Sequence, residues 1–416
     1  MLIGHQGILA AGGSGVVQSK SLMATYSAAV STLTSSVFYS PVGGSVWANS
    51  SDALRTALSP GVPGELSDVQ NPGFVTNAAP GGTIFYQAAN NRSTGTVLFA
   101  FTGGGVVTPT YSTGTVAVGA SDEIQFYQTA SGSTATSRGF LANFRHTGTG
   151  HVQIYGFSNQ ASISGSGVTR YTAVVGFTQS ISANAAWHDV RVSVATRLLK
   201  AAFRFFGNTR TVDTTIQVLV NGVAVASAVQ PAGSTADLTI TINYDASAND
   251  TVRFAYVMGV GSGNFGLNGI LVTNNLTSTA SDLFVAQRTS IWNAASLQYT
   301  PLLSGAASST ANSGVLAQNQ HTLQFRATLD TPQVYVSTNG GSAASIARLL
   351  VNGVASGVSV TIPVAAINQW ITGTGSIEVG PNDLVAWECT SAVVSGGTGN
   401  ANPTMLGIRC TYLSDS

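Results

Sequence analysis

Charged side chains are scarce in this sequence of 416 residues. Aspartate, glutamate, lysine and arginine together make up 8% of the chain, against about 25% in an average globular protein. Basic and acidic residues number 16 each, so the formal net charge is zero. A chain without a basic excess has no long-range field to attract DNA, RNA or an anionic membrane surface. The composition therefore argues against a nucleic-acid partner.

Long apolar runs and cysteines are scarce as well. No stretch reaches 18 consecutive apolar residues, so we expect no segment that inserts into a membrane. The residues up to Lys20 lack the basic start of a secretory signal. Two cysteines, Cys389 and Cys410, are too few to staple a chain of this size. We expect both to be small buried apolar residues, with a disulfide or a metal pair as the alternatives.

The sequence is rich in glycine, alanine, serine, threonine and valine, with 47 glycines. These residues favour strands and tight turns over helices. Ala195–Phe206 has helical propensity, but its counterpart Ala327–Ser337 contains Pro332, which would break a helix. We therefore expect strands at both segments. Ser50–Pro60 is the best helix candidate.

One short motif, Asp-x-(Ile/Val)-x-(Phe/Trp), occurs three times. It begins at Asp122, Asp250 and Asp383, with offsets of 128 and 133 residues. An acid in the turn before a strand can accept hydrogen bonds from the backbone N–H groups of the turn. The third and fifth residues of the motif would then point into a core. These expected core positions are Ile124, Phe126, Val252, Phe254, Val385 and Trp387.

Other landmarks keep the same period. Tyr39, Tyr171 and Tyr299 recur in register, and we expect them at an interface near an inter-subunit axis. The segment "VLVNGVA" around Asn221 returns as "LLVNGVA" around Asn352, and Asn-Gly between apolar runs predicts a hairpin with a type I′ turn. Apolar and polar residues alternate with a period of two, which indicates half-buried strands.

These repeats predict an all-β chain of three tandem antiparallel jelly-roll β-sandwiches, with a short extended N-terminal arm. The expected ranges are 1–24 for the arm, which we expect to dock onto another protein, and 25–149, 150–277 and 278–416 for the three jelly rolls.

The repeated unit resembles the jelly roll of the complement-globular and tumour-necrosis-factor-like superfamily. "VGASDEIQF", "DASANDTVRF" and "VGPNDLVAW" stand where that family has its Gly-Asp-x-Val strand, although Ser121, Asn249 and Asn382 replace the glycine before the aspartate. The resemblance covers nearly all of residues 25–416, in triplicate. It implies a homotrimer about a threefold axis. A pseudo-trimer formed by the three units of one chain is the alternative.

Such a sparsely charged chain of tandem sandwiches also looks like a structural protein of a tailed bacteriophage, made in the host cytoplasm and carried on the virion exterior. The resemblance implies a non-enzymatic capsid decoration or tail-associated fibre whose arm contacts other virion proteins. No heptad repeat is visible, which favours a decoration. Two alternatives remain: a receptor-binding adhesin that recognises a host surface glycan, and a carbohydrate-active enzyme.

Few residues suggest chemistry. His146 and His151 flank a turn and His188 is an imaginable third metal ligand, but no acid or cysteine is spaced to complete a site. Asp122 and Glu123 are adjacent and would point to opposite faces of a strand. We therefore expect no catalytic residue, no metal and no cofactor. The tryptophans other than Trp387 are expected in a core or a subunit interface, with glycan stacking as the alternative: Trp47, Trp187, Trp292 and Trp370.

Overall fold

The structure is a computed structural model. It describes residues 20–26, 37–40, 58–71, 84–91, 96–103, 110–111, 114–131, 139–177, 183–277, 280–288, 297–306, 316, 320–390 and 401–413. Apart from 3₁₀ turns such as η2 (Ala185–His188), the regular structure of these residues is β-strand. The prediction of an all-β sandwich fold is confirmed.

The first pair of sheets, which we call sandwich 1, is built from β1 to β9. Its inner sheet has the order β1 (Lys20–Tyr26), β9 (Gly139–His146), β3 (Gly64–Asn71) and β6 (Thr110–Tyr111), and β7 (Thr115–Val118) also pairs with β3. Its outer sheet has the order β2 (Val37–Ser40), β8 (Ile124–Ser131), β4 (Ile84–Asn91) and β5 (Thr96–Gly103).

Sandwich 2 is built from β10 to β19. Its inner sheet has the order β12 (Gly176–Phe177), β10 (Val152–Ser164), β19 (Asn264–Asn275), β14 (Thr196–Asn208) and β17 (Leu238–Ala246). Its outer sheet has the order β11 (Thr169–Ala173), β18 (Thr251–Met258), β15 (Thr214–Val220) and β16 (Val223–Gln230), and β13 (Val190–Arg191) also pairs with β18.

Sandwich 3 is built from β20 to β29. Its inner sheet has the order β22 (Ser304–Ala306), β20 (Ser281–Arg288), β29 (Ala401–Tyr412), β23 (Ala327–Asn339) and β26 (Gln369–Thr372), and β27 (Ser376–Val379) also pairs with β23. Its outer sheet has the order β21 (Leu297–Thr300), β28 (Val385–Thr390), β24 (Ser345–Val351) and β25 (Val354–Ile362).

Strand order is the same in the three sandwiches. In each inner sheet the first strand of the unit lies beside the last, as β1 does beside β9. In each outer sheet the strand of the Asp motif, such as β8, lies between the second strand of the unit and the first strand of a hairpin, such as β2 and β4. This is jelly-roll order. The predicted boundaries at 149/150 and 277/278 fall between β9 and β10 and between β19 and β20.

The predicted N-terminal arm needs a correction. Residues Lys20–Tyr26 form β1, which pairs antiparallel with β9 along its whole length. The last part of the range 1–24 is therefore a strand of sandwich 1, because its backbone groups find partners in that sheet. Residues 1–19 lie outside the described residues.

Two segments test the choice between strand and helix. Ala195–Phe206 and Ala327–Ser337 are strands, within β14 and β23 as described above. The predicted helix Ser50–Pro60 lies outside the described residues up to residue 57, and its end is not helical, because Leu58 forms a β-bridge with Ile124. Cross-strand pairing overrides local propensity there.

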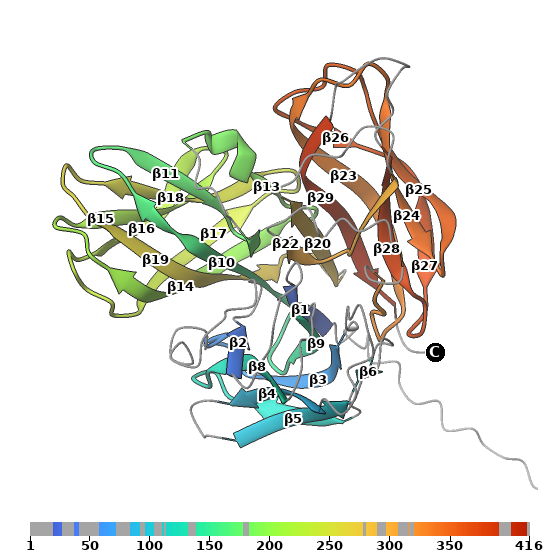
Figure 1. Cartoon of the computed structure of the whole chain (residues 1–416), viewed down its shortest axis with the longest axis horizontal. Helices are drawn as coiled ribbons and strands as arrows, with labels where there is room; N and C mark the ends of the chain where they lie inside the picture. The colour runs from blue at the N-terminus through green and yellow to red at the C-terminus, as the bar shows by residue number, and fades with distance from the viewer. Residues whose placement is uncertain are drawn as a thin grey trace, which may run out of the picture.

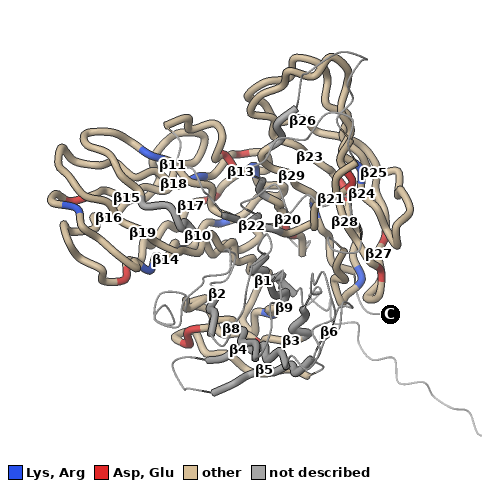
Figure 2. Tube along the Cα trace, viewed as in Figure 1, with Lys and Arg blue, Asp and Glu red and all other residues tan. Residues whose placement is uncertain are grey.

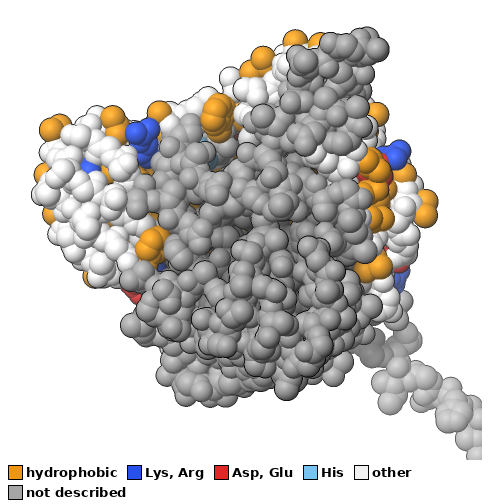
Figure 3. Space-filling view, in the orientation of Figure 1, with side chains coloured by type: hydrophobic (Ala, Val, Ile, Leu, Met, Phe, Trp, Pro, Cys, Tyr) orange, Lys and Arg blue, Asp and Glu red, His pale blue; other side chains and the backbone are white. Residues whose placement is uncertain are grey.

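The three sandwiches surround a common centre (Figure 1), where the edge strands of the inner sheets meet. Strand β1 lies beside β10 and β22, and β12 lies beside β20 and β22. Each sandwich thus touches the other two through the same edge of its inner sheet. Charged residues are few along the trace (Figure 2), and apolar side chains reach the visible surface of sandwiches 2 and 3 at several places (Figure 3).

Inner-sheet faces also pack between sandwiches. The face of the sandwich 2 sheet that points away from its own core joins the core cluster of sandwich 1, through Val152 and Ile154 of β10 and Ile270 and Val272 of β19. The corresponding face in sandwich 3 joins the core cluster of sandwich 2, through Leu283, Val285, Tyr335 and Met405. The buried apolar core therefore continues from one sandwich into the next.

Candidate functional site: the junction and cleft between sandwiches 2 and 3

The Asp motif has a structural place in all three sandwiches. The side chains of Asp122, Asp250 and Asp383 accept backbone N–H bonds from Gly119 (2.8 Å), Ser247 (2.8 Å) and Gly380 (2.7 Å), which closes the turn before the strand. The six expected core residues, Ile124, Phe126, Val252, Phe254, Val385 and Trp387, are all fully buried. The motif therefore has a structural role: its aspartate closes a turn, and its third and fifth residues fill the core.

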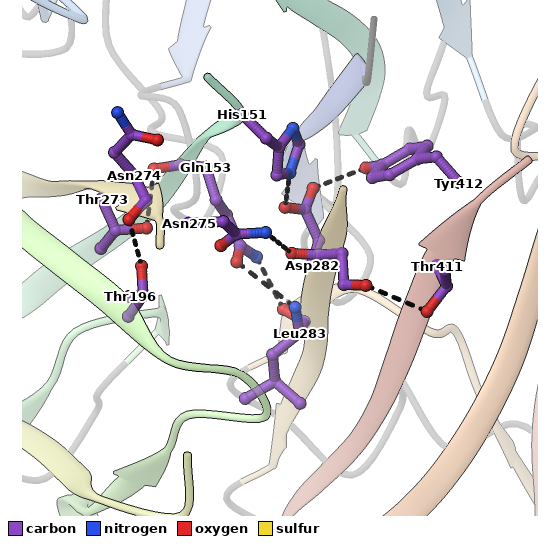
Figure 4. Close-up of polar contacts among 11 residues, drawn as sticks. His151, Gln153, Thr196, Thr273, Asn274, Asn275, Asp282, Leu283, Thr411 and Tyr412 are labelled. Atoms are coloured by element: carbon purple, nitrogen blue, oxygen red, sulfur yellow. Dashed lines mark hydrogen bonds and ion pairs between the residues drawn. The ribbon is translucent and has the colours of Figure 1, made fainter. Parts of the chain in front are cut away.

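A buried polar network joins sandwich 2 to sandwich 3 (Figure 4). His151 Nε2 hydrogen-bonds Oδ1 of Asp282, and the Tyr412 hydroxyl donates to Oδ2 of the same carboxylate at 2.5 Å. Both His151 and Asp282 are nearly inaccessible to solvent. Burial raises the pKa of the Tyr412 hydroxyl, and the Asp282 charge raises it further, so this group stays a donor. These hydrogen bonds join the two sandwiches at a buried position.

Amide groups reinforce this contact. Gln153 Nε2 donates to the Leu283 carbonyl at 2.9 Å, and its Oε1 accepts from the Leu283 N–H at 3.3 Å, so the side chain pairs with β20 as a neighbouring strand would. Asn275 Nδ2 donates to the Ser281 carbonyl at 2.6 Å. The backbone groups at the start of β20 are therefore satisfied by sandwich 2.

A second contact between the same sandwiches lies around η2. Trp187 Nε1 donates to Asn368 at 3.1 Å, and Arg191 donates to Thr372 at 3.3 Å. Trp370 packs edge-on against Tyr335, with ring centroids 5.6 Å apart. Trp187 is thus an interface side chain within one chain, and Trp370 packs on Tyr335 of its own sandwich, which belongs to the core cluster of sandwich 2. Trp47 and Trp292 lie outside the described residues.

Sandwiches 1 and 2 are joined by Arg204. Its guanidinium donates to Glu123 of sandwich 1 (2.5 and 3.3 Å) and to Asp237 of sandwich 2 (2.5 and 3.2 Å). Burial lowers the pKa of Arg204, but the hydrogen bonds to the two carboxylates outweigh it and the net shift is upward. Glu123 is therefore engaged in holding two units together.

The histidines that sequence reasoning grouped do not form a metal site. His146 Nδ1 lies 2.9 Å from the Pro63 carbonyl, His151 pairs with Asp282, and His188 is buried in η2. Within the part of the chain that the structure describes, no three metal-ligating side chains gather. The two cysteines are free thiols in buried positions, one in each sheet of sandwich 3.

The recurring tyrosines lie on the outer sheets, at one register position. Tyr39, Tyr171 and Tyr299 pair with Tyr127, Ala255 and Glu388, each five residues after the motif aspartate. Arg253 sits over the Tyr171 ring at 5.3 Å, and Tyr299 is 9% exposed. The side chain of Tyr39 lies outside the described residues. Their strands are not those that meet at the centre, and a role in an interface stays a prediction.

Sandwiches 2 and 3 leave a polar cleft of about 480 Å³ between them. Val194 and Thr277 line it from sandwich 2, and Ser281, Thr328, Asp330, Arg409 and Thr411 line it from the inner sheet of sandwich 3. Arg409 donates to both carboxylate oxygens of Asp330, at 2.6 and 2.9 Å. Sequence reasoning missed this site, because its residues lie as far as 217 positions apart in the sequence, from Val194 to Thr411, and form no motif.

The cleft lacks the arrangement of a glycosidase. Hydrolysis of a glycosidic bond uses two carboxyl groups that face each other across the substrate. Asp330 supplies the one carboxylate among the residues that line the cleft, and it is held by Arg409. What the site offers is a set of fixed donors and acceptors next to an apolar surface.

No family model matches the sequence, and no curated protein matches it. Solved structures share remote similarity. Two crystal forms of PNGF-II match at 9% identity, with TM-scores of 0.21 and 0.20, covering 68% and 70% of this chain and 74% of theirs. The insecticidal delta-endotoxin Cry8Ea1 from Bacillus thuringiensis matches at 8% identity and a TM-score of 0.16, covering 62% of this chain and 61% of its own. TM-scores this low indicate neither a shared fold nor a shared function.

The described residues contain no helix long and apolar enough to cross a membrane.

Proposed function

We propose that this chain is a non-enzymatic structural protein of the exterior of a tailed-bacteriophage virion, either a capsid decoration or a tail-associated fibre. The observation that carries the proposal is the packing of three jelly rolls around one centre. Edges and faces of the inner sheets, together with the Arg204–Glu123 ion pair and the His151–Asp282 hydrogen bond, are used to join units. A chain whose side chains mainly pack its units together is suited to a structural role.

Sparse charge supports the same proposal. Removing a charged group from water at an interface is costly unless it is paired. The described ion pair between Arg204 and Glu123, which joins sandwiches 1 and 2, has its charges paired in this way, and much of the rest of the chain is uncharged. A protein that lies against copies of other virion proteins needs such a surface. The N-terminal arm, residues 1–19 after the correction above, is proposed to contact those proteins.

The hydrogen bonds and ion pairs made by the acidic side chains favour a non-enzymatic role. Asp122, Asp250 and Asp383 close turns, and the carboxylates of Glu123 and Asp330 are held by arginines. A general acid or base needs a carboxyl group that can reach a substrate and exchange a proton.

Labelling of intact particles tests the virion location. In particles purified from a phage that encodes this sequence, we expect the protein to be present and an antibody against sandwich 3 to label the outer surface in electron micrographs. The position of the label separates capsid from tail. Absence of the protein from purified particles, or a label that appears only after disruption, would reject the proposal.

The oligomeric state separates the two trimer hypotheses. The superfamily resemblance implies a homotrimer, but the inner-sheet edges of the three units already meet one another within this chain. We therefore favour the intrachain pseudo-trimer and expect a native mass near 42.4 kDa. A native mass three times as large would restore the homotrimer.

A receptor-binding adhesin is the second candidate function. The observation that favours it is the polar cleft between sandwiches 2 and 3, because a scaffold alone has no need of an open site with paired donors and acceptors.

A further inference from the structure

The cleft lies on a sheet face that sandwich 2 uses for packing. In sandwich 2, Val272 of β19 pairs with Lys200 of β14 at the position that Arg409 and Asp330 occupy in sandwich 3. Val272 is buried against sandwich 1, whereas the side chains of Arg409 and Asp330 are 34% and 19% exposed. The same face is therefore covered in one unit and open in the other.

The lining residues form two parallel rows across three strands. Ser281, Thr411 and Thr328 are cross-strand partners on β20, β29 and β23. Two residues along, and so on the same face, Leu283, Arg409 and Asp330 form the next row. A row of hydroxyls thus stands beside an ion pair. Leu283 begins the apolar part of the face, which packs against sandwich 2.

The bonds between Arg409 and Asp330 hold both side chains in place and leave hydrogen-bonding groups that a ligand can use. A guanidinium carries five N–H groups and a carboxylate about four acceptor positions. Arg409 uses two of its donors on Asp330, and Asp330 also accepts from the Thr331 hydroxyl at 3.0 Å. Three further N–H groups of the guanidinium are not used in these two bonds. The pair has no net charge, so it gives an anion little attraction, but it offers a donor beside an acceptor.

Neighbouring hydroxyl groups of a sugar match this chemistry. Each hydroxyl both donates and accepts, so one can accept from Arg409 while the next donates to Asp330 or to a threonine. The volume of about 480 Å³ lies within the range of about 300–1,000 Å³ that holds small ligands. Val194 supplies an apolar contact from the opposite wall.

We propose that the cleft binds a neutral saccharide through a pair of adjacent hydroxyls, with Arg409 and Asp330 as the central contacts. Thr328 and Thr411 flank these contacts. The site requires both sandwiches, because Val194 and Thr277 close it from sandwich 2. The inference does not rest on the virion location and stands or falls separately from it.

Titration of the full chain by saturation-transfer difference NMR tests the site. The probes are glucose, galactose, mannose, maltose and lactose, with glucuronic acid as the anionic comparison. We expect saturable binding of at least one neutral sugar. The double variant Asp330→Asn with Arg409→Gln removes both charges and shortens the arginine side chain. It should weaken that binding at least tenfold, because its amides fix the neighbouring hydroxyls less firmly.

Sandwich 1 offers a matched control. Glu65 and Arg145 form the same cross-strand ion pair on β3 and β9, with side chains 28% and 33% exposed. Glu65→Gln with Arg145→Gln should leave sugar binding unchanged. If the Asp330/Arg409 variant does not fold, Thr328→Val, which removes one hydroxyl without changing the shape, should weaken binding several-fold.

Four results would overturn the proposal: no neutral sugar binds, only glucuronic acid binds, the Asp330/Arg409 and Glu65/Arg145 variants weaken binding equally, or Thr328→Val binds like the unchanged chain.

Discussion

Single asparagine and aspartate side chains stabilise the outer-sheet turns of sandwiches 2 and 3. In sandwich 3, Asn352 donates through Nδ2 to Oδ1 of Asp383 (2.7 Å) and accepts the Leu384 N–H at Oδ1 (2.9 Å). Asn221 makes the same two bonds to Asp250 and Thr251 in sandwich 2. The repeated aspartate therefore ties the hairpin turn to the turn before the next strand.

A double-mutant cycle measures this tie. Asp383→Ala and Asn352→Ala should each lower the free energy of unfolding by about 0.5–1.5 kcal/mol, because each removes the hydrogen bonds between a half-buried aspartate and an exposed asparagine. The double variant should lose less than the sum, with a coupling near 1 kcal/mol. Chemical denaturation of the four proteins gives the coupling, and strictly additive losses would show that the two side chains do not cooperate.

Two buried histidines shape the response to acid. Among the described residues, His188 and His321 have no hydrogen-bond partner at either ring nitrogen. Burial lowers the pKa of His188 to about 4, with a further contribution from the Arg253 charge, and burial lowers the pKa of His321 to about 4. Both rings are therefore neutral in the folded chain at pH 7.

Stability should fall as the pH drops from about 6.5 to about 4. In that window the unfolded chain binds protons at these histidines while the folded chain does not. The free energy of unfolding therefore falls by a few kcal/mol in total, at about 1.4 kcal/mol per pH unit for each histidine. Above pH 6.5 they have no effect, and below pH 4 the loss levels off. Urea midpoints at pH 7.5, 5.5 and 4.5 measure the slope. His321→Leu should flatten it, and an unchanged slope in this variant would contradict the assignment.

At the scale of the elements, the hairpins show how local sequence sets geometry. Asn221 and Gly222 have φ of 49° and 81°, and Asn352 and Gly353 have φ of 51° and 78°. Two successive residues with positive φ define the type I′ turn that Asn-Gly predicts. These turns position β15 against β16 and β24 against β25. The prediction from the two Asn-Gly dipeptides is confirmed, because the geometry of such a turn depends mainly on the residues that form it.

Gly353→Ala tests the turn. A Cβ there meets nothing closer than 3.5 Å, so any loss comes from the left-handed backbone. We expect a cost of about 1–2 kcal/mol in the free energy of unfolding. Gly207→Ala is the control, because a Cβ at Gly207 also meets no atom within 4 Å and its φ is not positive. The control should change stability by less than about 0.5 kcal/mol. Equal losses in calorimetry would contradict the explanation.

For the whole molecule, the joints between sandwiches matter most. The His151–Asp282 pair is buried where sandwiches 2 and 3 meet, whereas the Arg197–Asp245 pair within sandwich 2 is about half exposed. Burial decides the energetic weight of the two pairs, since water screens the exposed one.

His151→Phe should destabilise the junction. The change keeps an aromatic ring but removes a hydrogen bond to the buried Asp282 carboxylate, whose remaining described partner is Tyr412, at a cost of about 1.5–3 kcal/mol. We expect the calorimetric transition to shift down or to split as sandwich 3 uncouples. Asp245→Ala, which breaks the exposed pair, should leave the transition in place. A variant that melts like the unchanged chain would show that the network does not join the units.

The sequence alone determined the all-β class, the triple repeat, the hairpin turns and the core positions of the Asp motif, because each depends on residues close together in the chain. It misplaced the boundary of the arm, where β1 finds its partner β9 more than 100 residues away. Only the tertiary structure decided which sheet edges meet, which histidine pairs with Asp282, and that Arg409 and Asp330 face an open cleft. These outcomes depend on how complete sandwiches pack against each other, and no local spacing encodes that packing.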